Sequence, residues 1–184
     1  MKQIVTRCKW CNTVNPLYVK YHDTEWGRPT HDEALLFEML LLESFQAGLS
    51  WECVLNKREN FRKAFSGFDA VAIAAYDDSR VEELMQDAGI IRHRLKIKSA
   101  IRNARIFLDI QKEFGTFDAY LRQFTHGEVI VESHRTTSPL SDALSRDLYR
   151  RGMRFVGSTI IYSYLQAIGV INSHGEECFL SPAR

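Results

Sequence analysis

The chain has 184 residues, 45% of them hydrophobic, which suits one domain with one substantial core. Its 24 Lys and Arg residues nearly balance its 23 Asp and Glu residues, so the net charge of +1 argues against a generally polycationic nucleic-acid binder. The first residues contain no apolar stretch of the signal-peptide kind, and no segment approaches the ~20 apolar residues of a membrane span, so we expect a cytoplasmic protein.

Helix start and stop signals recur along the chain, whereas repeats and low-complexity linkers are absent. Thr30 and Glu33 have the spacing of a capping box, which predicts a helix from Asp32 to Ala47 with Gly48 as its stop. The expected helices cover residues 32–47, 50–65, 69–76, 79–88, 92–114, 116–124, 141–151 and 158–168.

Strand-like alternation is weak and confined to residues 128–131. The predicted fold class is therefore all-α. We expect one domain spanning residues 1–184, because no linker divides the chain.

The first predicted helix is apolar almost all the way round, which is typical of a central buried helix. Glu43 lies inside this apolar run, and an unpaired carboxylate is costly to bury. It therefore bonds an Arg or a backbone amide elsewhere, faces a cavity, or lies near the helix end where water enters. A tight turn brings Trp51 close behind it, so the two side chains could form a pocket for a nucleobase, although a core Trp would give the same sequence.

The N-terminal stretch is dense in aromatic residues without helical periodicity. Trp10, Tyr18, Tyr21 and Trp26 surround His22. Such clusters are more often core than ligand pocket, and the accompanying His favours a functional role.

Potential metal ligands occur near both ends of the chain. Cys8, Cys11 and His22 lie near the start, and His174 and Cys178 lie four residues apart near the end, one helical turn, so that both can face one ion. Without an export signal, thiols are expected to stay reduced or to bind metal. Four such ligands would form a closed, structural zinc site that ties the two ends together.

A basic run follows the turn that contains Gly89. Turn amides and a helix N-terminus can donate to DNA phosphates, which is the arrangement of a helix-hairpin-helix clamp at about residues 79–105. A plain pair of helices with a solvated basic face would have the same pattern. The basic residues are Arg92, Arg94, Lys96, Lys98, Arg102 and Arg105.

Four motifs together resemble one known family. They are YxxYHDxEWG at residues 18–27, LExxQAGLSW at 42–51, DAGIIRHR at 87–94 and FVGSTI at 155–160. In this order and over nearly the whole chain, they are similar to DNA-3-methyladenine glycosylase I, of the helix-hairpin-helix glycosylase superfamily.

The resemblance implies a monofunctional base-excision repair enzyme that acts on double-stranded DNA. Such an enzyme flips the damaged nucleotide out of the duplex and hydrolyses the N-glycosidic bond of 3-methyladenine. We expect a monomer. The resemblance also places one structural zinc ion on Cys8, His22, His174 and Cys178, and leaves Cys11 outside the family's ligand set.

The resemblance further assigns roles in the pocket and at the DNA. Glu43 would accept from the amino edge of adenine, and Leu49 would fill the gap left in the duplex. Gly89, Arg92 and Arg94 would contact DNA from the hairpin. Trp51 would stack on the base, while Tyr21, Tyr18, Trp10 and Trp26 would shape the walls.

Two features concern the chemistry and its environment. Related glycosylases carry a catalytic Asp after the hairpin's second helix, and this family lacks it, so Glu43 is expected to recognise the base and help its departure without attacking the sugar. Phe45 stands where the family usually has a Gln, which would alter one pocket wall or repack it.

Two other functions are compatible with parts of the sequence. A DNA-binding module without activity would need the hairpin alone, whereas Glu43 and Trp51 are also present in register. A zinc-dependent nucleobase deaminase would need an open metal position and a His-x-Glu…Cys-x-x-Cys pattern, which the chain lacks.

Overall fold

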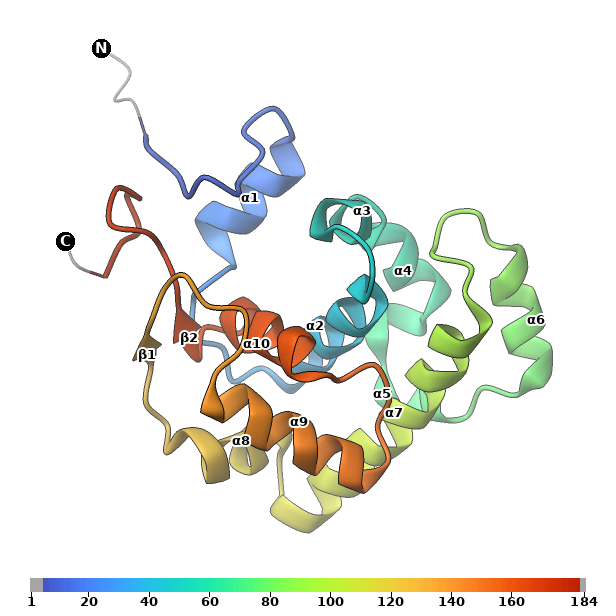
Figure 1. Cartoon of the computed structure of the whole chain (residues 1–184). Coiled ribbons are helices and arrows are strands. Elements are labelled where there is room, and N and C mark those ends of the chain that lie inside the picture. The colour runs from blue at the N-terminus through green and yellow to red at the C-terminus, as the bar shows by residue number, and fades with distance from the viewer. Residues whose placement is uncertain (1–4, 183–184) are drawn as a thin grey trace.

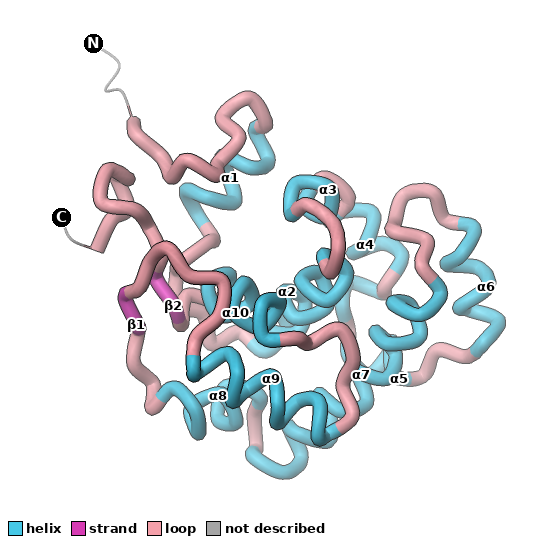
Figure 2. Tube along the Cα trace, in the orientation of Figure 1, coloured by secondary structure: helices cyan, strands magenta, loops and turns pink. Residues whose placement is uncertain are grey.

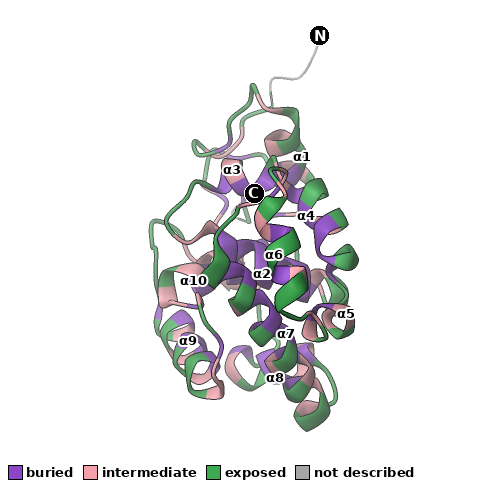
Figure 3. Ribbon diagram, turned by 90° about the vertical axis from the view of Figure 1, so that its right-hand side faces the viewer, coloured by how far each residue is buried: buried purple, intermediate pink, exposed green. Residues whose placement is uncertain are grey.

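Helix α2 (Glu33–Gln46) forms the centre of the molecule, because every residue from 36 to 45 is buried. The coordinates are a computed structural model, in which residues 5–182 are described. Helices α10, α7, α8 and α3 contact α2, and Figure 3 shows the buried positions gathered along it. The prediction of a mostly helical fold with a buried helix at residues 32–47 is confirmed.

The other elements surround α2 (Figure 1). They are α1 (Pro16–Thr24), α3 (Trp51–Leu55), α4 (Arg58–Ala64), η1 (Ser66–Phe68), α5 (Ala70–Ala74), α6 (Asp78–Gln86), α7 (Arg94–Phe114), α8 (Phe117–Thr125), β1 (Ile130–Val131), α9 (Pro139–Arg151), α10 (Ser158–Ala167) and β2 (Ile171–Asn172).

The predicted capping box at the start of α2 is wrong. Asp32 is the N-cap, and its side chain accepts from the amides of Ala34 and Leu35. The carboxylate of Glu33 instead accepts from the amides of Phe117 and Asp118 at 2.8 and 2.9 Å, and so caps the start of α8. Glu33 satisfies orphan amides of a helix that is distant in sequence, which local spacing does not reveal.

The helix predicted over residues 50–65 is two helices, α3 and α4. The break falls at Asn56 and Lys57, where the sequence has neither Gly nor Pro. There the Lys57 ammonium donates to the carbonyls of Ala88 and Gly89 at 3.1 and 3.3 Å. We attribute the break to such tertiary contacts, which local periodicity does not encode.

Helix α1 was not predicted, because it is short and buries few residues. Its start nevertheless carries a local signal: Asn15 accepts from the amide of Leu17, and Pro16 occupies the first turn, where a missing N–H is harmless. Of its residues, Tyr21 and His22 are buried. The helix therefore places two neighbouring side chains of the candidate site.

Two short strands within the last third of the chain pair with each other. The expected strand appears as β1, which lies beside β2 in Figure 2. The two strands pair in parallel, with Ile130 opposite Ile171. Beyond β2 the chain returns to the N-terminal segment, where the Phe179 amide donates to the Thr6 carbonyl at 2.9 Å. Across residues 5–182, no helix has the length and apolar character needed to cross a membrane.

Candidate active site and metal centre

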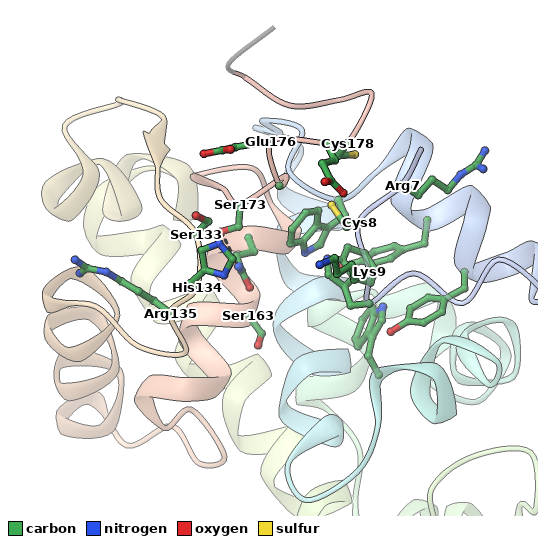
Figure 4. A pocket seen from close by; sticks show the side chains of 18 of the residues that line it. Arg7, Cys8, Lys9, Ser133, His134, Arg135, Ser163, Ser173, Glu176 and Cys178 are labelled. Carbon is green, nitrogen blue, oxygen red and sulfur yellow. Dashed lines mark hydrogen bonds between the residues drawn. The ribbon is translucent and has the colours of Figure 1, made fainter. Parts of the chain in front are cut away.

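A cavity of about 780 Å³ lies between the N-terminal segment, α2, α3 and α10 (Figure 4). The cavity contains Glu43 and every aromatic residue that the sequence analysis placed in a base pocket. Those residues are Trp10, Tyr18, Tyr21, Trp26 and Trp51. Three separate segments, residues 10–26, α2 and α3, contribute them, so the grouping is a product of the fold.

Glu43 is 2% exposed and reaches the cavity from the buried face of α2. Among the described residues, its Oε2 has no hydrogen-bond partner, and burial raises the pKa of its carboxyl to about 8. The alternative of an Arg partner does not apply, because the buried Arg58 instead pairs with Glu38 and Glu25. A free titratable group therefore faces the cavity.

Two more polar atoms of the cavity lining are buried and unpaired in the same way. Gln46 Oε1 and Trp51 Nε1 are buried without a hydrogen-bond partner in the described part of the chain, and both residues line the cavity. Buried polar groups are almost always hydrogen-bonded in folded proteins. One unpaired carboxyl, one amide oxygen and one indole N–H around a single space indicate a site built for a polar, flat ligand.

The aromatic walls are in mutual contact. The rings of Tyr21 and Trp51 have centroids 5.1 Å apart, and those of Trp10 and Trp26 are 4.6 Å apart. Tyr18 meets Trp10 edge-on at 5.5 Å. Trp10 is 38% exposed, whereas Tyr21, Trp26 and Trp51 are buried. The cavity therefore has rigid aromatic faces on which a nucleobase could stack.

The turn from α2 to α3 sets Trp51 in place. Gly48 has a φ of +78°, a conformation that favours glycine, and the Leu49 amide donates to the Gln46 carbonyl at 2.6 Å. Ser50 then caps α3 by accepting from the Cys53 amide. Leu49 itself is 41% exposed at the tip of the turn.

Phe45 does not form a cavity wall. It is buried and packs edge-on against Phe61 and Phe65, so of the two outcomes expected for this position the fold shows repacking in the core. Gln46, the next residue, lines the cavity instead.

The opposite wall was missed by sequence reasoning. Ser163 and Gln166 come from α10, and the segment 133–135 crosses the same side; Figure 4 shows Ser133 and His134 next to Ser173. Gln166 donates to the Ser173 hydroxyl at 2.7 Å. No local pattern distinguishes these residues, because only the packing of α10 beside α2 brings them to the cavity.

The four side chains predicted as metal ligands lie together at one edge of the cavity. Their ligand atoms, the sulfurs of Cys8 and Cys178 and one ring nitrogen each of His22 and His174, all lie within 4.8 Å of one another. The Cys178 sulfur is 3.5 Å from both His22 Nε2 and His174 Nδ1. In tetrahedral zinc sites, Zn–S and Zn–N bonds imply S···N separations of about 3.6 Å. The cluster thus has the size and donor set that zinc requires.

Outer contacts orient both histidines toward the cluster. His22 Nδ1 lies 2.8 Å from an Asp23 carboxylate oxygen, and Asp23 also pairs with Arg7 at 2.6 Å. His174 Nε2 lies 3.2 Å from the Trp26 carbonyl. Such partners, which hold one ring nitrogen and turn the other toward an ion, are typical of metal-binding histidines.

The fold bears on two further points about the metal ligands. Cys11 lies outside the cluster, with its sulfur 3.9 Å from the Tyr18 carbonyl, in keeping with its place outside the ligand set that the resemblance implies. The segment from His174 to Cys178 is a turn and not a helix, closed by the Cys178 amide donating to Gly175. The two ligands therefore converge through the turn.

The predicted hairpin is present as α6, a connection over residues 87–93, and α7. Within the connection, the Gly89 amide donates to Asp87 Oδ1 at 2.7 Å, so this amide is used inside the turn and is not offered to a phosphate as expected. A Cβ on Gly89 would lie 2.9 Å from Asp87 and 3.1 Å from Asn60. Gly89 therefore serves close packing.

The basic run that follows is not one solvated face. Arg92 is exposed and has no ion pair within residues 5–182, whereas Arg94 pairs with Glu82 and Lys98 pairs with Asp78. Lys96 is buried. Within the hairpin, Arg92 is thus the predicted DNA contact that is free to meet a phosphate without first breaking an ion pair.

Comparison with known proteins agrees with this geometry. The sequence profile of the methyladenine glycosylase family matches residues 10–181. The chain belongs to this family. It is 47% identical over 182 residues to DNA-3-methyladenine glycosylase 1 of Escherichia coli (strain K12), an alignment that covers 96% of this chain and 97% of that protein.

Solved structures of family members share the fold. A crystal structure of 3-methyladenine DNA glycosylase I superposes with a TM-score of 0.92 at 45% identity and covers 96% of this chain and 100% of the other. The Staphylococcus aureus 3-methyladenine DNA glycosylase I, from a study of 3-methyladenine recognition, has a TM-score of 0.89 at 32% identity, with 92% and 94% covered. In this methyladenine glycosylase chain, the family match includes the cavity's aromatic residues and Glu43.

Proposed function

We propose that this protein is a monomeric DNA repair glycosylase that hydrolyses the N-glycosidic bond of 3-methyladenine in alkylated double-stranded DNA. The observation that carries the proposal is the unpartnered Glu43 carboxyl at the floor of an aromatic cavity. A base can reach such a cavity only when its nucleotide is flipped out of the helix. Family membership supports the same reaction.

Recognition would combine stacking with one polar contact. Trp51 and Tyr21 offer faces for the flipped base, while Trp10, Tyr18 and Trp26 close the walls. An oxygen of Glu43 can accept from the exocyclic amine of adenine, whether the carboxyl is protonated or not. Guanine presents an oxygen at the corresponding edge, so a Glu43 carboxylate would meet 7-methylguanine acceptor to acceptor.

The elevated pKa of Glu43 supplies a reason for preferring a charged base. Burial removes this carboxyl from water and makes its ionised form unfavourable, which raises its pKa to about 8. A cationic 3-methyladenine nucleotide beside it would favour the carboxylate, whereas undamaged adenine would not. Glu43 would thus stabilise the damaged nucleotide in the flipped state.

Little further chemical assistance is needed for bond cleavage. The cationic base is already a good leaving group, so the enzyme mainly has to extrude it and stabilise the oxocarbenium-like sugar. We assign Glu43 to recognising the base and helping its departure, without attack on the sugar. A strong nucleophile is not required.

The Cys/His cluster would hold one structural zinc ion through its four side chains, those of Cys8, His22, His174 and Cys178. Bound zinc would supply a cross-link between the two ends of the chain, because four protein ligands would fill a tetrahedral site and leave no open position for a substrate or water. This arrangement disfavours the deaminase alternative, which needs such a position.

The DNA contacts follow from the exposed positions around the cavity. Leu49, at the tip of the α2–α3 turn, would fill the gap that the flipped nucleotide leaves. Arg92 and, once released from Glu82, Arg94 would bind phosphate, with Gly89 shaping the hairpin connection.

The test is release of free bases from methylated duplex DNA, separated by chromatography. We expect release of 3-methyladenine with little 7-methylguanine, and a decrease of about 10–100-fold in kcat/KM for Glu43→Gln, which corresponds to ~1.4–2.8 kcal/mol. Glu128→Gln, the same chemical change at an exposed position, serves as the control. Full activity of Glu43→Gln would remove Glu43 from recognition and chemistry. No release by folded wild-type protein would leave a DNA-binding module.

A further inference from the structure

Lys96 is a buried lysine whose ammonium has only backbone carbonyls as hydrogen-bond partners within residues 5–182. It is 6% exposed, and its Nζ donates to the carbonyls of Phe45 at 2.8 Å and Ala47 at 2.6 Å. The aromatic ring of Phe155 covers it at 5.8 Å from Nζ to the centroid. Within residues 5–182 it forms no ion pair, and its charge lies against the carbonyls at the end of α2.

The carbonyls that Lys96 binds are those that the end of α2 leaves without helical partners. The last carbonyls of a helix need other donors, and a cation there also interacts favourably with the helix dipole. Many helices meet this need with a left-handed residue directly after the last turn. Here Ala47, the residue after α2, has a φ of −45° and a ψ of 114°, and the left-handed Gly48 follows it, so the Leu49 amide reaches the Gln46 carbonyl. Lys96 supplies the donor for the carbonyls of Phe45 and Ala47 beside this turn.

The same contact holds the base of the turn that carries Leu49. We call residues 47–50 the wedge turn. Its tip is not packed, since a Cβ on Gly48 would meet nothing within 4 Å. Apart from the Leu49 amide to Gln46 bond and the Ser50 cap of α3, the described contacts that fix it are those of Lys96.

Lys96 also belongs to the first turn of α7, directly after the hairpin connection. His93 caps this helix by accepting from the Lys96 amide at 3.3 Å. One residue therefore joins the segment expected to grip DNA phosphates to the turn expected to enter the duplex. A shift of the wedge turn relative to the hairpin would misplace Leu49 on bound DNA.

We propose that Lys96 is a positioning residue that locks the wedge turn to the hairpin, so that Leu49 enters the duplex in register with the flipped nucleotide. The inference rests on the proposed function of Leu49. It predicts a defect specific to duplex DNA, because a base in a single strand needs no wedge to leave the helix. A purely structural cap would affect both substrates alike.

The experiment compares Lys96→Met with Leu49→Ala and with the double variant. Release of 3-methyladenine is measured from a methylated duplex and from the same strand alone. We expect Lys96→Met to lower kcat/KM about tenfold or more on the duplex and less than about threefold on the single strand. The double variant should resemble Leu49→Ala, since both changes remove one function.

Two further variants guard against trivial explanations. Lys112→Met removes an exposed lysine near the other end of the same helix and should leave both activities unchanged. Lys96→Gln keeps an N–H donor for the carbonyls and should restore part of the duplex activity, which also covers the case that Lys96→Met does not fold. Equal losses on both substrates, or additive effects in the double variant, would overturn the inference.

A readout independent of cleavage separates this inference from the proposed activity. A 2-aminopurine placed opposite the lesion reports local unstacking by its fluorescence when protein binds. We expect the wild-type response to be lost in Leu49→Ala and in Lys96→Met. A wild-type response without base release would overturn the activity alone, whereas an undiminished response in Lys96→Met, or none in the wild type, would overturn the role of Lys96.

Discussion

The rings of Tyr21 and Trp51 are in contact, with centroids 5.1 Å apart and planes tilted by 45°. This contact joins α1 to α3, two helices that are separated in sequence by the whole of α2. Tyr21 is followed directly by His22, whose ring belongs to the Cys/His cluster. The base pocket and the metal centre therefore share one short helix, and the state of one is expected to affect the other.

Loss of one metal ligand should weaken both the fold and the pocket. Cys178→Ser is expected to lose stoichiometric zinc and to lower stability by about 2–3 kcal/mol, which is roughly 5–10 °C in Tm for a chain of this size. Base release should fall as well, because α1 carries Tyr21. Cys11→Ser, a buried thiol outside the cluster, should keep its zinc. Metal analysis and thermal melting check this; a chelator without effect on Tm would contradict it.

Glu43 should make the protein less stable as pH rises. Its folded pKa, about 8, lies above the ordinary value of 4.5, so between these values the unfolded chain holds fewer protons than the folded chain. The free energy of unfolding then decreases from about pH 5 to pH 8 and levels off above the folded pKa. Glu43→Gln removes this loss and should be more stable than wild type at pH 8.5 by on the order of a few kcal/mol. Urea unfolding at pH 5.5 and 8.5 measures it, and an equal difference at both pH values would refute it.

Trp51 should contribute through its aromatic face. Stacking of a base on an aromatic side chain is worth about 1–3 kcal/mol by alanine substitution. We expect kcat/KM for 3-methyladenine release to fall about 10–100-fold in Trp51→Ala and only a few-fold in Trp51→Phe, which keeps a ring against Tyr21. Circular dichroism verifies that both variants fold. Equal activities of the two variants would argue against stacking.

Arg92 should bind a DNA phosphate, a contact that does not depend on the base sequence. Arg92→Ala is expected to weaken duplex binding and to reduce the slope of log K against log salt by about 1, as for loss of one phosphate contact. Lys112→Ala removes a cation near the other end of α7, where it pairs with Asp109, and should not change the slope. Binding titrations at several salt concentrations decide between these outcomes. An unchanged slope in Arg92→Ala would place the phosphate contacts elsewhere.

Much of the helical framework was predictable from sequence, because its signals are local. The apolar run around Glu43, the Gly48 stop and the Ser50 cap all lie within a few residues of the structure they determine. The motifs also carried the family resemblance, and with it the residues proposed for the pocket and the metal centre. The predictions from local spacing were wrong for polar groups whose hydrogen-bond partners lie far along the chain.

Tertiary structure alone decided those partners. Glu33 has the spacing of a local cap, yet its carboxylate serves α8; Lys96 has the sequence context of a DNA-binding lysine, yet its ammonium serves the end of α2. The convergence of Cys8 with His174, at 3.5 Å, is likewise a product of the fold. The physical reason is that a buried charge or orphan backbone group must find a partner, and packing determines which distant residue supplies it.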